Sequence, residues 1–132
     1  MIHRVLTIGR WDIDFLFAED GYDKQAVLYC LYEAYAPEDI IEQAKDLMYG
    51  CEYNCGFTYS NTYRKRAVIL IGPTTSGEEF QDTFVHELHH LAVAIAEGLG
   101  IDLESETPAY IAGDSARELA DVVCNFGCRH CK

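Results

Sequence analysis

Apolar and polar residues alternate along this chain with two different periods, and these periods predict its strands and helices. Residues 5–8 and 11–17 predict two short strands that a Gly-Arg pair joins as a hairpin. In the second strand, apolar side chains alternate with Asp12 and Asp14, which is typical of a strand with one buried and one solvent-facing side. The chain therefore begins with a β-hairpin.

The next segments predict two helices and then two strands. Residues 23–35 and 37–50 carry apolar side chains at helical spacing, so we expect two amphipathic helices. Residues 57–60 and 67–71 are strand candidates. The second of these is the more apolar, which favours a central position in the sheet.

A long helix is expected after the last strand. Ser76 and Glu79 form a capping box at its start, and Gly98 or Gly100 ends it. Its apolar stripe, at about 100° per residue, consists of Phe80, Phe84, Leu88, Leu91, Ile95 and Leu99. A last helix is expected from Thr107 or Pro108 through about Val123. These elements predict a single domain of the α+β class over residues 1–132.

The long helix contains His86-Glu87-Leu88-His89-His90, which has the form H-E-x-x-H. Residues four apart lie on one face of a helix, so His86 and His90 can bind one Zn²⁺. Glu87 lies beside them, where a carboxylate can take a proton from a metal-bound water. The pair lies nearly opposite the apolar stripe, so it faces solvent or a cleft. A surface histidine pair is the alternative, and the adjacent Glu and the capped helix favour a metal site.

A catalytic zinc usually needs a third protein ligand. Ala96 occupies the position, six residues after His90, where a third histidine would stand, so we expect a carboxylate. Glu106 is preferred because it starts a helix that returns antiparallel to the zinc helix, and small Ala109 allows close packing. Glu104 competes with it, and a carboxylate favoured by the helix dipole is the alternative role.

At this point the chain resembles a known family. A strand, the H-E-x-x-H helix and Glu106-x-x-Ala109-Tyr110 are similar to the gluzincin pattern of small zinc metallopeptidases of the minigluzincin and ImmA/IrrE-like kind, often phage-associated. The resemblance covers residues 67–123. It implies a zincin-like fold, with a small mixed β-sheet packed on the active-site helix and a returning ligand helix, and two further N-terminal helices.

The resemblance also implies an activity. Zn²⁺ held by His86, His90 and Glu106 would supply a bound water that hydrolyses a peptide bond, with Glu87 as general base. Tyr110 is the leading candidate to stabilise the oxyanion. Two other tyrosines rank behind it, Tyr59 and Tyr63. Residues 57–60 would be the edge strand that pairs with an extended peptide or protein substrate. The alternative is a catalytically inactive zinc-binding accessory or interaction protein on the same fold.

Composition narrows the classes of partner. The net charge of −12 and the pI of about 4.6 oppose contact with phosphate backbones, so we expect no nucleic-acid partner. The acidic composition is also compatible with a third interpretation, an acidic regulatory domain whose histidines are surface residues of a helix and bind no metal. No apolar run approaches the length of a membrane span, and residues 1–10 lack the core of a signal peptide. We therefore expect a cytoplasmic protein with no membrane partner, whose substrate and oligomeric state the sequence does not specify.

Six cysteines remain to be explained, at positions 30, 51, 55, 124, 128 and 131. The last three have the spacing of radical iron–sulfur enzymes, but those enzymes need a large barrel after the motif. A structural zinc knot stays open, using Cys128 and Cys131 with either Cys51 and Cys55 or Cys124 and His130. Otherwise we expect reduced cysteines, with Cys30 in the core.

Overall fold

A computed structural model describes the backbone of residues 1–102 and 104–128, with side chains through residue 125. These residues form four strands and five helices. In chain order they are β1 (Ile2–Ile8), β2 (Trp11–Phe17), α1 (Lys24–Glu33), α2 (Glu38–Gly50), β3 (Gly56–Asn61), β4 (Arg66–Ile71), α3 (Gly77–Gly98), α4 (Thr107–Glu118) and α5 (Ala120–Cys128). None of the helices described combines the length and the apolar character needed to cross a lipid bilayer. His130 and Cys131, which were candidate ligands, lie outside the described residues.

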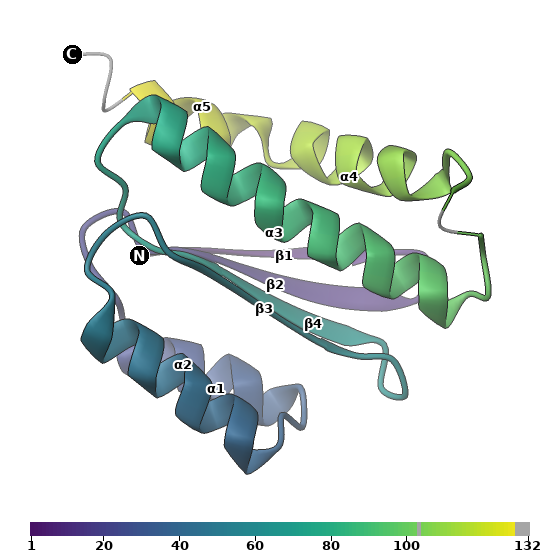
Figure 1. The fold of residues 1–132 in the computed structure, drawn as a ribbon, viewed down its shortest axis with the longest axis horizontal. Helices are drawn as coiled ribbons and strands as arrows, with labels where there is room; N and C mark the ends of the chain where they lie inside the picture. Colours follow the sequence, from purple (N-terminus) through teal and green to yellow (C-terminus); the bar gives the residue numbers. More distant parts are fainter. Residues whose placement is uncertain (103, 129–132) are drawn as a thin grey trace.

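The strands form one mixed sheet in the order β1-β2-β4-β3. The β1–β2 and β3–β4 pairs are antiparallel, whereas β2 and β4 run parallel. Helices α1 and α2 cover one face of the sheet, and α3, α4 and α5 cover the other (Figure 1). Each face carries its own apolar core. The α+β class and the small mixed sheet are therefore as predicted.

The first hairpin forms where the sequence predicts it, but its second strand is more buried than the alternation indicates. Gly9 makes the turn with a φ of +60°, a conformation that favours glycine. Phe15 packs in the core beneath α3, while Leu16 packs in the core beneath α1 and α2. Asp14 is only 5% exposed. Asp12 is exposed as predicted, but the solvent-facing side is wrong for Asp14 and Leu16, because helices cover both faces of β2.

Strand β3 lies at the edge of the sheet, as predicted for residues 57–60. Among the described strands it pairs with β4 alone, and every residue along it is half-buried. Thr58 lies opposite Ile69, whose side chain belongs to the core beneath α3. Tyr59 lies opposite Val68, which belongs to the core beneath α1 and α2. The register thus decides which β3 side chains can reach the H-E-x-x-H helix.

Helix α3 begins and packs as its sequence predicts. The Ser76 hydroxyl accepts a hydrogen bond of 3.1 Å from the backbone N–H of Glu79. The predicted apolar stripe is buried in the core as far as Ile95. Leu99 departs from this pattern with 56% exposure, because it is the residue that caps the C-terminal end of the helix. The buried stripe fixes the rotation of α3 and leaves its histidine face outward.

The predicted last helix is divided into α4 and α5. Leu119 separates them and is fully buried in the core. The Ser115 hydroxyl donates a hydrogen bond of 2.8 Å to the carbonyl of Ile111, one turn earlier, a contact that often bends helices. The periodicity alone did not reveal this break, because burial of Leu119 is a tertiary effect.

The cysteines are arranged differently from the expectation of free thiols. Cys51 and Cys55 form a disulfide across the loop between α2 and β3, with Cα atoms 6.4 Å apart. Cys30 is buried in the core, as predicted, and Cys124 is exposed on α5.

Candidate metal centre

The two histidines of the H-E-x-x-H motif meet on the outer face of α3. Their Nε2 atoms lie 3.1 Å apart, and the rings are nearly perpendicular, with centroids 4.7 Å apart. Both side chains are exposed, as the helical rotation predicts. His89 points in another direction, since it lines a second pocket together with residues of α4. His86 and His90 therefore form the pair that the sequence spacing predicts, and His89 is not part of it.

Glu87 lies beside this pair and is buried. Its ligand atoms and those of the two histidines all lie within 4.8 Å of one another. Only 4% of the residue is exposed, because the side chain enters the space between α3 and the edge strand. The Thr58 hydroxyl donates a hydrogen bond of 3.1 Å to Oε1 of Glu87. A Cβ added at Gly56 would lie 2.7 Å from Cγ of Glu87, so the start of β3 must be glycine for the carboxylate to fit.

Burial also changes the acidity of this carboxyl group. Removal from water raises the pKa of Glu87 above its usual range, and the hydrogen bond from Thr58 opposes that shift. The two histidines oppose it as well. A carboxylate with a raised pKa beside two imidazoles is able to accept a proton near neutral pH, as a general base must.

The three residues open onto a cleft of about 660 Å³. One wall is α3 and the opposite wall is β3, with Gln43 of α2 and Asn54 of the preceding loop at the margin. Asp82, four residues before His86, lies on the same face of α3 and also lines the cleft. An extended ligand would therefore find the edge strand, the histidine pair and Glu87 in one groove.

The structure does not bring Glu106 to the histidine pair. Within the described part of the chain, no carboxylate other than Glu87 lies within 4.8 Å of both imidazoles. Helix α4 begins beside the C-terminal end of α3 and runs back along it (Figure 1). Its apolar residues pack on the α3 face that carries His89. Glu106 is exposed and accepts a hydrogen bond of 3.2 Å from the Tyr110 hydroxyl.

The candidate tyrosines and the second carboxylate also lie elsewhere. Tyr110 is 65% exposed and does not line the cleft. The Tyr59 hydroxyl donates to the backbone carbonyl of Tyr35, on the other side of the sheet, over 3.4 Å. Tyr63 is 90% exposed in the turn after β3. Glu104 lies in the α3–α4 loop, exposed, with its backbone N–H bonded to Asp102.

Three contributors to the site were not identified from the sequence. Gly56 and Thr58 meet Glu87 from a strand 29 to 31 residues away in the chain, and no local pattern marks such a contact. Asp82 could have been found, because its spacing to His86 repeats the spacing between the two histidines.

No known protein family, curated protein or solved structure matches this chain.

Proposed function

We propose that this protein is a zinc-dependent hydrolase of peptide bonds and that the cleft between α3 and β3 is its active site. One observation carries the proposal: two imidazole nitrogens 3.1 Å apart lie next to a buried carboxylate in an open cleft. The gluzincin-like pattern of the sequence supports the same chemistry. A cytoplasmic location is part of the proposal, and the substrate class is a peptide or protein.

The histidine pair suits a zinc ion. Two nitrogens bound to tetrahedral Zn²⁺ at 2.0–2.1 Å are separated by about 3.3 Å, close to the separation of 3.1 Å in this structure. Glu106 is the carboxylate proposed to complete the ligand set. Its side chain is exposed at the start of α4 and would have to turn toward the histidine pair to bind the same ion. Tyr110, bonded to Glu106, would then orient that carboxylate.

The remaining chemistry belongs to residues of this chain. A bound Zn²⁺ would lower the pKa of a water molecule and polarise the scissile carbonyl. Glu87 would accept the proton of the attacking water and pass it to the leaving amine. The hydroxyl of Thr58 holds Oε1 of Glu87, so the carboxylate is oriented before substrate arrives. Its low exposure excludes bulk water from the proton-transfer group.

The edge strand supplies the means to hold a peptide. Strand β3 has backbone groups on one side that no other described strand pairs with, and this side borders the cleft. An extended peptide can add to such an edge through main-chain hydrogen bonds. A substrate bound in this way would pass the histidine pair and Glu87.

A second candidate is a zinc-binding accessory protein without turnover. The observation that favours it is the position of Tyr110, which lies outside the cleft and leaves no tyrosine hydroxyl there for the developing oxyanion. Such a protein would bind zinc and a peptide in the same cleft without cleaving it. The two candidates therefore share a metal site and differ in turnover.

Cleavage of a peptide library by the zinc-loaded protein, compared with its Glu87→Gln variant, distinguishes them. We expect Glu87→Gln to lose about 10²–10⁴-fold in rate while it still binds zinc. Glu97→Gln, an exposed carboxylate on the same helix, is the matched control and should keep its activity. Zinc bound with no cleavage by the parent protein would establish the accessory protein, and cleavage retained by Glu87→Gln would remove Glu87 from the mechanism.

A further inference from the structure

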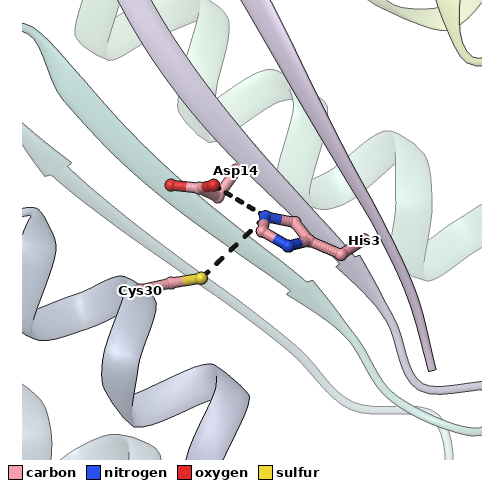
Figure 2. A group of neighbouring side chains, drawn as sticks. All are labelled: His3, Asp14 and Cys30. Carbon is pink, nitrogen blue, oxygen red and sulfur yellow. Dashed lines mark hydrogen bonds and ion pairs between the residues drawn. The ribbon is translucent and has the colours of Figure 1, made fainter.

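A second group of metal-ligating side chains lies on the opposite face of the sheet. His3 of β1, Asp14 of β2 and Cys30 of α1 point toward one another, with the imidazole between the carboxylate and the thiol (Figure 2). His3 Nε2 lies 2.7 Å from Oδ1 of Asp14 and 4.0 Å from Sγ of Cys30. All three ligand atoms lie within 4.8 Å of one another.

We propose that His3, Asp14 and Cys30 form a second divalent-metal site, for an ion of the Zn²⁺ or Co²⁺ type. Imidazole, carboxylate and thiolate are all zinc ligands, and the sulfur disfavours Mg²⁺ and Ca²⁺. This site is separate from the histidine pair of α3, because the sheet lies between α1 and α3 (Figure 1). It does not depend on the proposed hydrolase activity.

The distances need little adjustment to fit an ion. Around a tetrahedral zinc, nitrogen and oxygen ligands are separated by about 3.3 Å and nitrogen and sulfur ligands by about 3.6 Å. The observed separations of 2.7 and 4.0 Å differ from these values by about half an ångström in opposite directions. A small movement of the imidazole, whose side chain is 45% exposed, can correct both. The exposed side of His3 also leaves a route for the ion and for a water as fourth ligand.

The burial of Asp14 supports a role beyond filling space. Its neighbours on this face of the sheet, Leu16, Val68 and Leu70, are apolar and fully buried, whereas a carboxylate is costly there unless cations compensate it. Arg66 donates to Oδ2 of Asp14 over 3.4 Å and so leaves Oδ1 for an ion on the His3 side. Hydrogen bonds of this kind orient carboxylates that ligate metals.

The ligand charges also suit a cation. A carboxylate and a thiolate would together place two negative charges against a divalent ion and the Arg66 guanidinium, and binding would release the thiol proton of Cys30 to solvent. In the absence of an ion, burial and the neighbouring Asp14 raise the pKa of Cys30 to about 11. The alternative role is a core thiol beside a hydrogen-bonded His3–Asp14 pair, with no metal.

Titration with Co²⁺ tests the proposal, because a thiolate bound to Co²⁺ gives a near-ultraviolet charge-transfer band that imidazole and carboxylate do not. The full chain should carry His86→Ala and His90→Ala, so that the first site does not contribute. We expect a band that saturates at one equivalent of Co²⁺. Adding Cys30→Ser should abolish it, whereas adding Cys124→Ser, an exposed cysteine, should leave it unchanged.

Three results would overturn the proposal: no band in the folded parent, a band that survives Cys30→Ser, or a band lost when Cys128 and Cys131 are replaced by serine. The last result would assign the thiolate to the C-terminal cysteines. If Cys30→Ser does not fold, His3→Ala provides the test, since that side chain is half-exposed. Its Co²⁺ affinity should fall by about tenfold or more, and an unchanged affinity would exclude the site.

Discussion

The hydroxyl of Thr58, on the edge strand, donates a hydrogen bond of 3.1 Å to Oε1 of Glu87, on the helix that carries the histidine pair. This contact joins two elements that are 29 residues apart in the sequence. It fixes the direction of the carboxylate in a place where only 4% of Glu87 is exposed. The edge strand is thus part of the candidate site, in addition to its proposed role of pairing with substrate.

Removing this hydroxyl should destabilise the protein. In Thr58→Val the side chain keeps its shape, but the buried Glu87 oxygen loses its donor, which costs about 1–3 kcal/mol in the free energy of unfolding. Urea denaturation of the metal-free protein measures this loss. Thr58→Ser restores the hydroxyl and should recover most of the stability. Equal stability of the Val variant and the parent would show that the hydrogen bond contributes nothing.

Gly56→Ala should disturb the carboxylate directly. The added Cβ would lie 2.7 Å from Cγ of Glu87, so one of the two must move. Such overpacking costs about 1–3 kcal/mol in stability, and a shift of about 1 Å in a catalytic group can slow a reaction about 100-fold.

Gly113→Ala is the matched control for that variant. Gly113 lies within α4 and an added Cβ would meet nothing within 4 Å, so alanine should stabilise the helix by about 0.5–1 kcal/mol. Thermal unfolding and peptide cleavage of both variants check the pair. Two variants with the same stability and activity would contradict the packing of Gly56 on Glu87.

The fold could be predicted to the extent that its elements depend on local pattern. Gly9, Ser76 and the α3 stripe specify a turn, a cap and a rotation from residues close in the chain, and all three predictions are confirmed except at Leu99, the last residue of the stripe. The break at Leu119 and the burial of Asp14 depend on which elements cover each other. The hydrophobic periodicity of the sequence does not show which elements cover each other.

Some residues of the candidate site could likewise be predicted from local pattern, and others could not. His86, Glu87 and His90 are predictable because the α-helix alone brings residues four apart together. The place of Glu106 depends on the register between two packed helices, and one turn of difference moves a side chain by about 5.4 Å. The cluster around His3 joins three elements across 27 residues, so no sequence spacing marks it.

The ion pair between Arg4 and Asp121 should depend on pH. Arg4 Nη2 donates to Oδ2 of Asp121 over 2.6 Å, and this hydrogen bond lowers the pKa of the carboxyl group below its usual value. A lowered folded-state pKa means that the stabilisation is present above the unfolded pKa of about 3.9 and is lost as the pH falls through the folded value. The pair is exposed, so salt should weaken it.

Carboxyl-carbon NMR titration of Arg4→Ala measures this effect. The pKa of Asp121 should rise toward its ordinary value when the guanidinium is removed. Arg117→Ala removes the same charge from another exposed ion pair, with Asp114, and should leave Asp121 unchanged. An Asp121 pKa that does not respond to Arg4→Ala would show that the β1–α5 contact is absent in solution.

The proposed function depends above all on a zinc ion held by His86 and His90 in the cleft. The most direct measurement is equilibrium dialysis against Zn²⁺ with metal analysis, in a Cys30→Ser background that removes the second proposed site. We expect one bound equivalent in Cys30→Ser and none after His86→Ala and His90→Ala are added. A protein that binds no zinc, or that binds it equally with and without the two histidines, would show that this pair does not hold the ion.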